Sequence, residues 1–168
     1  MKSDFTRQRI KTFRIDERLI HGQVIATWLK TLGITHLIVA NDQAASDEIQ
    51  KSALKMAVPS GVKCLIKSID DAARILKDPR CNSMSIMLIV GSPEDAVRLM
   101  PLVDGIPEVN LANFGSITKP DVPDKLAISN MVYLDADDIK AVNQIISFGK
   151  PLFTQKTPSE PRKIIKQL

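Results

Sequence analysis

The segment at residues 14–23 concentrates reactive side chains, because it contains Arg14, Asp16, Glu17, Arg18 and His21. A neutral imidazole is a good nucleophile near neutral pH, since its unperturbed pKa is about 6.5. Arg18, three positions before His21, offers a planar fork of donors that suits phosphate oxygens. These residue types and spacings favour phosphoryl transfer, with His21 as the acceptor.

The elements around this segment would position it well for that chemistry. Residues 10–15 are predicted to form a strand, and residues 22–32 show the periodicity of a helix. His21 would therefore lie in a strand-to-helix connection, with Gly22 and Gln23 in the first helical turn. The unpaired N–H groups of that turn, at the positive end of the helix dipole, would stabilise an anion beside His21.

A second interpretation of the same segment requires no chemistry. Charged connections of alternating sign are usually solvated loops with weak ion pairs, and His21 could have a structural role. That interpretation does not explain a histidine and a glycine at the start of an apolar helix, where Ser, Asp or Asn is the ordinary cap. The residue types alone leave both interpretations open.

A family resemblance distinguishes them. Residues 14–24 read R-I-D-E-R-L-I-H-G-Q-V and are followed by Trp28. This run resembles the signature of the IIB subunits of the mannose/fructose/sorbose family of the bacterial sugar phosphotransferase system. The resemblance continues along most of the chain, at Asn41 and Asp42 after the second expected strand, at residues 57–62, and in the apolar run 87–90.

The resemblance implies a phosphocarrier, a protein-histidine:sugar phosphotransferase that needs no cofactor. His21 matches the histidine that receives a phosphoryl group from the phosphohistidine of a IIA partner. That group then passes to a sugar brought in by the membrane subunits IIC and IID. Arg18 would stabilise the charge of the transferring phosphoryl, and Asp16 would orient the imidazole or Arg18. Arg14, Gly22 and Gln23 are further candidates for contact with phosphate or a partner.

One stretch departs from the family pattern. Many members carry a glycine-rich N-V-G-G-M segment where this chain reads V-N-L-A-N-F-G-S at residues 109–116. Asn110 is retained, but Ala112 and Asn113 replace the paired glycines, which removes positive-φ freedom and room for close backbone approach. Gly115 would supply that freedom, and Asn113 and Ser116 are candidate site residues. The departure supports an alternative function, a regulatory or interaction module of the same fold that does not phosphorylate sugar.

Length and pattern predict one α/β domain over residues 1–168, with residues 1–9 as a loose arm. Alternating strands and helices favour a mostly parallel open sheet with helices on both faces. The expected strands are 10–15, 36–40, 62–66, 85–90, 107–111, 131–134 and 151–154. The expected helices are 22–32, 43–57, 68–76, one starting at 93, and 135–148, and residues 118–125 are expected to be a polar loop.

Three further candidates follow strands at the edge where parallel sheets bind ligands. Asn41 and Asp42 come directly after the second strand, and their alternative role is to cap the helix at 43–57. Ser92 follows the fourth strand. If that strand pairs beside the first, Ser92 would lie near His21; its alternative role is the N-cap before Pro93.

Composition disfavours other classes of function. A net charge of +4 and 4% aromatic residues argue against nucleic-acid binding, and fit an acidic partner face near His21 instead. Cys64, Cys81 and the two histidines lack metal-site spacing, so no metal is expected. No glycine-rich fingerprint follows the first strand, which disfavours a nucleotide-binding domain.

The sequence also carries expectations about location and assembly. It has no apolar run of about eighteen residues and no signal-peptide core, so we expect a cytoplasmic protein that meets the membrane only through IIC and IID. A homodimer remains open.

Overall fold

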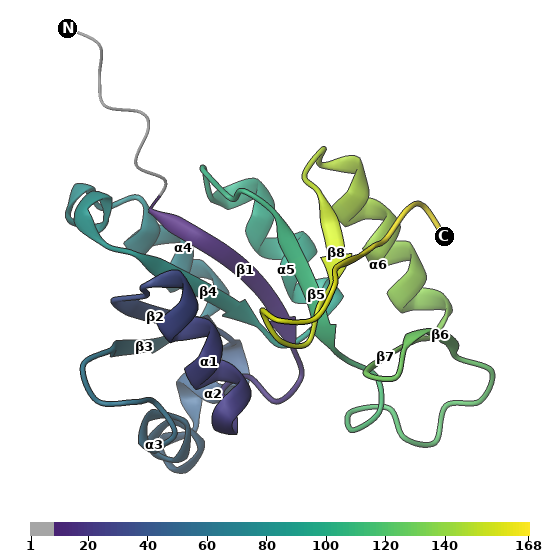
Figure 1. Cartoon of the computed structure of the whole chain (residues 1–168), viewed down its shortest axis with the longest axis horizontal. Helices are drawn as coiled ribbons and strands as arrows, with labels where there is room; N and C mark the ends of the chain where they lie inside the picture. The colour runs from purple at the N-terminus through teal and green to yellow at the C-terminus, as the bar shows by residue number, and fades with distance from the viewer. Residues whose placement is uncertain (1–8) are drawn as a thin grey trace, which may run out of the picture.

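The computed structural model describes residues 9–168, so the expected arm at residues 1–9 lies outside the described residues except for Arg9. Within that range one sheet of seven strands has the order β3-β2-β4-β1-β5-β8-β9 (Figure 1). Its neighbouring pairs with defined register are parallel except β8–β9. The expected mostly parallel α/β sheet is confirmed. Its strands are β1 (Ile10–Asp16), β2 (His36–Ala40), β3 (Lys63–Lys67), β4 (Ile86–Val90), β5 (Val109–Asn113), β8 (Leu152–Thr154) and β9 (Lys163–Ile164).

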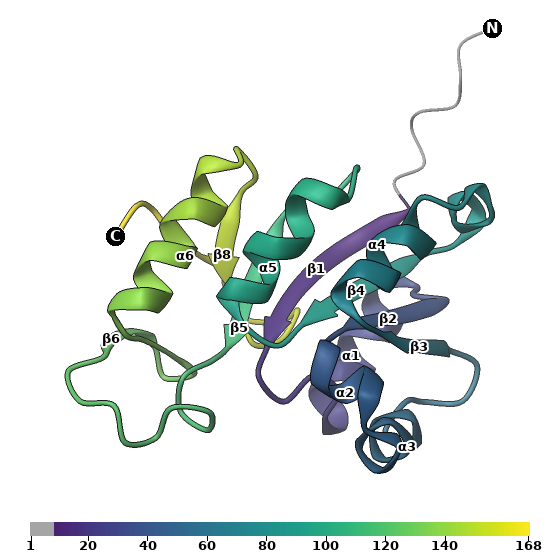
Figure 2. The same cartoon turned by 180° about the vertical axis from the view of Figure 1, so that it is seen from behind.

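Helices cover both faces of this sheet. The helices are α1 (Gly22–Leu32), α2 (Asp42–Ser46), α3 (Glu48–Met56), α4 (Ile69–Leu76), α5 (Pro93–Leu99) and α6 (Ala136–Ser147), with short 3-10 turns η1 (Pro79–Ser83) and η2 (Met100–Leu102). Figure 1 shows α1 and α3 on the near face, and Figure 2 shows α4, α5 and α6 on the other. Each face therefore has its own apolar core, as a doubly covered parallel sheet requires.

The central strand β1 is apolar on one face and polar on the other. Ile10, Phe13 and Ile15 pack into the core shared with α4, α5 and α6. Arg14 and Asp16 alternate with them and are buried, so they belong to the opposite face, which α1 covers. The strand thus places the buried Arg14–Asp16 ion pair at the edge of the sheet where α1 begins.

The expected helix at 43–57 is wrong as a single element. The structure has two helices, α2 and α3, and the break lies at Asp47. The Asp47 side chain accepts from the N–H groups of Ile49 and Gln50 at 3.0 and 3.1 Å. A short acceptor side chain competes with the helical backbone and caps a new helix, which is the physical reason for the break.

Strand boundaries in the second half also differ from expectation. The fifth strand runs two residues later than predicted, and this places Asn113 inside it. The strands β6 (Leu126–Ser129) and β7 (Val132–Leu134) form a separate antiparallel pair. Neither β6 nor the two-residue β9 was expected, because segments of two to four residues are too short to show the alternation of a strand.

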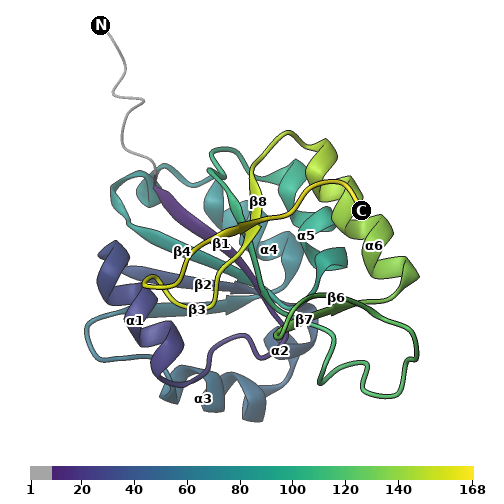
Figure 3. The same cartoon turned by 45° about the vertical axis from the view of Figure 1, so that its right-hand side comes forward.

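The segment after β8 crosses the α1 face of the sheet (Figure 3). The backbone oxygen of Lys156 accepts from the indole Nε1 of Trp28 at 2.9 Å. The Asn110 amide donates to the Gln155 backbone oxygen at 3.0 Å and accepts from its N–H at 3.1 Å. Trp28 is a core residue, and Asn110 anchors the C-terminal segment. None of the described helices is long and apolar enough to cross a bilayer.

Candidate active site

The carboxylate of Asp16, the last residue of β1, is the centre of the site. Asp16 is fully buried, and its Oδ2 accepts from Nε and Nη2 of Arg14 at 3.1 and 3.0 Å. Burial lowers the pKa of Arg14, and the charge of Asp16 acts in the opposite direction. Two of the three guanidinium nitrogens thus bond one carboxylate oxygen, while Nη1 of Arg14 is buried with no partner among the described atoms.

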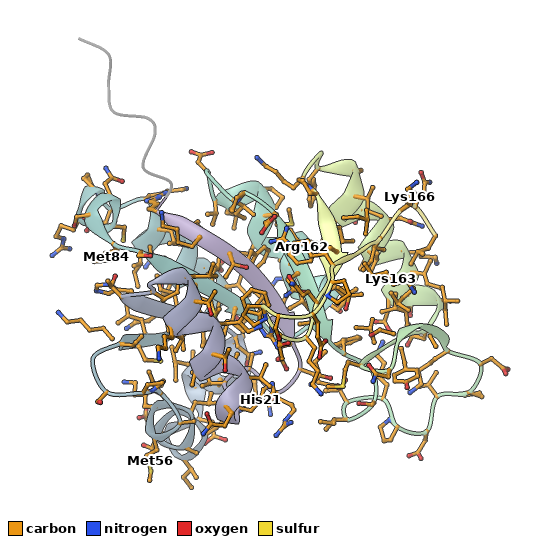
Figure 4. All side chains as sticks on the ribbon, in the orientation of Figure 1. His21, Met56, Met84, Arg162, Lys163 and Lys166 are labelled. Carbon is orange, nitrogen blue, oxygen red and sulfur yellow. The ribbon has the colours of Figure 1, made fainter. Side chains whose placement is uncertain are left out.

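His21 contacts the same carboxylate oxygen. Its Nε2 lies 2.8 Å from Oδ2 of Asp16, and its side chain is 13% exposed. In the neutral imidazole, a hydrogen on Nε2 that donates to this oxygen leaves the lone pair on Nδ1. Figure 4 shows His21 at the start of α1, far along the molecule from Met84, which precedes β4. The site therefore lies at the carboxyl ends of the strands.

The start of α1 is open to an anion. His21 is the N-cap residue and makes no side-chain capping bond, so the first N–H groups of the helix are not capped by it. Gly22 has φ +48°, a conformation that favours glycine, and both Gly22 and Gln23 are exposed. The local sequence thus leaves the positive helix end accessible beside the imidazole.

Arg18 is held through its backbone and leaves its guanidinium available. Its N–H donates to Oδ1 of Asp16 at 2.9 Å, and the residue is exposed. Within residues 9–168 no hydrogen bond or ion pair engages its side chain. Asp16 therefore contacts both residues it was expected to orient, the imidazole with one oxygen and the backbone of Arg18 with the other.

The candidates that follow β2 and β4, namely Asn41, Asp42 and Ser92, accept hydrogen bonds from helix starts rather than contacting His21. Asn41 accepts from Ala44 N–H at 2.8 Å and Ser92 from Asp95 N–H at 3.1 Å, which confirms the capping alternative for both. Asp42 instead accepts from Ile69 N–H at 2.9 Å and from Arg98 at 3.0 Å. Strand β4 does pair beside β1, but the hydrogen bonds of the described residues join none of these three to His21.

A cavity of about 300 Å³ borders the loop at residues 16–21, called here the His21 loop, which connects β1 to α1. Leu19 and Glu17 of that loop line the cavity together with Asn41 and Ser92. These two candidates therefore lie near the loop, but His21 does not line the cavity. The remaining lining residues are Gln43, Gln50, Gly91, Glu94, Asp95, Phe114, Thr118, Lys119 and Asp138.

The segment that departs from the family pattern packs against the same loop. Asn113 pairs with Asp16 across β1 and β5, and its backbone oxygen accepts from Glu17 N–H at 2.9 Å. Its side chain is buried, with Oδ1 unpartnered among the described atoms. Gly115 has φ +96°, and a Cβ there would overlap the carbonyl oxygen of Tyr133, so Gly115 does supply the expected conformational freedom.

Glu17 is the residue whose role sequence reasoning missed. Its carboxylate accepts hydrogen bonds from backbone and hydroxyl groups of Ser116 and Thr118, about one hundred positions away. No local pattern in the sequence predicts these partners. The only signal that could have marked Glu17 as a site residue is its position next to Asp16. Among residues 9–168 no group of three or more His, Cys, Asp or Glu side chains is arranged to hold a metal ion.

Comparisons with known proteins point in one direction. The family model described as "PTS system sorbose subfamily IIB component" matches residues 10–168. A "probable phosphotransferase enzyme IIB component" of Streptococcus pyogenes serotype M6 is 38% identical over 160 residues, covering 95% of this chain and 98% of that protein. The mannose-specific EIIAB component of Escherichia coli K12 is 30% identical over 149 residues, 89% of this chain and 45% of that protein. The crystal structure of the IIBSor domain of the Klebsiella pneumoniae sorbose permease superposes with a TM-score of 0.82 at 27% identity, covering 91% of each chain.

Proposed function

Because the chain belongs to the sorbose-subfamily IIB components of the sugar phosphotransferase system, we propose that His21 is its phosphoryl carrier. It takes the phosphoryl group from the phosphohistidine of a IIA protein and gives it to a sugar. The observation that carries this proposal is the 2.8 Å contact between Asp16 Oδ2 and His21 Nε2, which leaves Nδ1 as the nucleophile.

The first step is a displacement at phosphorus. The Nδ1 lone pair of His21 forms the new N–P bond while the N–P bond of the donor histidine breaks and returns its electron pair to that ring. The His21 ring becomes more positive as the bond forms, and Asp16 stabilises the charge at Nε2–H. In the second step a sugar hydroxyl oxygen forms the O–P bond while the His21 N–P bond breaks and returns its electron pair to Nδ1; the hydroxyl proton passes to water, and His21 is neutral again.

Two groups stabilise the phosphoryl oxygens during both steps. The open N–H groups at the start of α1 lie beside His21, and the Arg18 guanidinium has no competing partner among the described residues. Positioning and charge stabilisation provide most of the catalysis of phosphoryl transfer. Arg14 contributes indirectly, because it fixes the Asp16 carboxylate.

The partners follow from the same proposal. The E. coli relative is an EIIAB component of which this chain matches less than half, which supports a IIA domain as the phosphoryl donor. The membrane subunits IIC and IID present the sugar and set its identity, and they bring the chain to the cytoplasmic side of the membrane. His21, 13% exposed, is reached by each partner in turn at the edge of the sheet.

The test is sugar phosphorylation by membranes that contain IIC and IID. Purified chain, a IIA protein, phosphoenolpyruvate and the general phosphotransferase components are added with radiolabelled sugar, and sugar phosphate is counted. We expect His21→Ala to abolish it. The matched control is His36→Ala, because His36 opens β2 at the opposite end of the sheet. Sugar phosphate formed with His21→Ala would contradict the proposal, and a wild-type chain that is phosphorylated without passing the group on would favour the regulatory alternative.

A further inference from the structure

We infer that Glu17 is a positioning residue for phosphoryl transfer, a role that rests on the function proposed above for His21. Its carboxylate links the loop at residues 16–21 to the turn at residues 115–119, and this link fixes the orientation of the His21 imidazole beside Asp16. Glu17 itself touches no reacting atom.

The carboxylate of Glu17 is saturated with donors. Its Oε1 accepts from the N–H and the hydroxyl of Thr118, both at 2.9 Å, and from Ile117 N–H at 3.3 Å. Its Oε2 accepts from Ile117 N–H at 3.2 Å and from the N–H and hydroxyl of Ser116 at 3.3 Å. Three consecutive backbone donors around one side chain form a nest for an anion. Glu17 is therefore held at both oxygens.

The turn that receives Glu17 is anchored separately. Lys125 Nζ donates to the backbone oxygens of Gly115 and Lys119, each at 2.6 Å. Lys119 Nζ in turn lies 2.7 Å from Asp135 and 2.8 Å from Asp138 at the start of α6. The turn is thus held by Lys125 and by the start of α6 independently of Glu17, and the Glu17 contacts tie the His21 loop to it.

Glu17 acts on His21 through Asp16, the residue that precedes it in the chain and contacts the imidazole. Glu17 follows Asp16, whose carboxylate bonds both His21 and the backbone of Arg18. Two residues further on, Leu19 has φ +59°, a strained conformation for a leucine that persists only when its surroundings fix it. Without Glu17 the loop could relax at Leu19, and the direction of Nδ1 would no longer be fixed.

The charge of Glu17 is compatible with a phosphoryl group nearby. Burial acts to raise the pKa of its carboxyl, but hydrogen bonds from Thr118 and Ile117 together outweigh burial and lower it. The carboxylate is therefore ionised, and its negative charge faces donors of the turn. Glu17→Gln keeps the size of the side chain but turns an amide NH2 toward these donors, whereas Glu17→Asp keeps the charge on a shorter stem.

The experiment compares phosphoryl uptake by Glu17→Gln, Glu17→Asp and the control Glu48→Gln, an exposed carboxylate of α3 paired with Lys51. Phospho-IIA is the donor, and intact mass gives both the initial rate and the final extent of phosphorylation. We expect Glu17→Gln to reach the full extent on His21, with a limiting rate about tenfold lower and an unchanged half-saturating concentration of phospho-IIA. Glu17→Asp should recover part of the rate, and 15N spectra of Glu17→Gln should show a second imidazole tautomer of His21.

The outcomes separate the two proposals. A wild-type limiting rate in Glu17→Gln, or a change confined to the half-saturating concentration, would overturn the positioning role. If Glu17→Gln unfolds, Thr118→Val removes one hydroxyl donor and keeps the backbone donor, and a wild-type rate in that variant would equally overturn it. No phosphoryl uptake by the wild-type chain would instead contradict the function assigned to His21.

Discussion

Asp16 Oδ2 lies 2.8 Å from His21 Nε2, and the same oxygen accepts two hydrogen bonds from Arg14. One atom thus joins the buried ion pair of β1 to the side chain that would carry phosphate. Because β1 fixes Arg14 and Asp16 on the same face, the strand places the carboxylate that the imidazole contacts.

We predict that Asp16→Asn slows phosphoryl uptake by about 10²-fold, because the amide can donate to Nε2 and favour the wrong tautomer. It should also lower the free energy of unfolding by about 3 kcal/mol, since Arg14 is left buried beside a neutral group. Urea unfolding and the rate of uptake from phospho-IIA measure the two effects. The control is Asp121→Asn in an exposed loop. A rate within twofold of wild type would show that the Asp16 contact has no part in transfer.

Removal of the Arg18 side chain should separate catalysis from stability. Arg18→Ala keeps the backbone N–H that donates to Asp16, so we expect an unchanged thermal midpoint. The rate should fall by about 10²-fold, because one donor to the phosphoryl oxygens is lost. Arg18→Lys should recover part of that rate, since it restores the charge without the planar fork. Arg80→Ala, an exposed arginine paired with Asp78, is the matched control; equal rates in the two alanine variants would refute a special role for Arg18.

The Glu17 carboxylate should make stability depend on pH in a defined direction. Its pKa is lowered from the ordinary 4.5 in the folded chain, so its contribution is fully present above that pH and is lost as the pH falls through the lowered value. The difference in thermal midpoint between wild type and Glu17→Gln should be constant from neutral pH to about 5 and shrink below about 4.5. Thermal melts across this range test it. A difference that grows on acidification would contradict the hydrogen bonding assigned to Glu17, and Glu48→Gln should show no such trend.

The local part of the site could be predicted from sequence. Asp16, Arg18 and His21 lie within six positions, and a strand before them and a helix after them follow from apolar periodicity. Chain proximity then brings the three together whatever the rest of the fold. The caps at Asn41 and Ser92 are local signals of the same kind, and the structure confirms them.

The long-range part could not be predicted. The partners of Glu17 are separated from it by about one hundred residues and include backbone N–H groups, which every residue type except proline carries. The split between α2 and α3 depends on whether Asp47 caps a helix or faces solvent within one. The exchange of hydrogen bonds between Asn110 and Gln155 likewise depends on which strand lies beside β5.

We expect His21 to carry the phosphoryl group on Nδ1, and the most direct test is a proton–phosphorus correlation NMR spectrum of the chain phosphorylated through a IIA protein. The coupling pattern of the ring protons identifies the phosphorylated nitrogen. We predict one phosphorus signal, coupled to the His21 ring through Nδ1, present in wild type and His36→Ala and absent in His21→Ala. A signal that persists in His21→Ala, or one that arises from Nε2 of His21, would contradict the account.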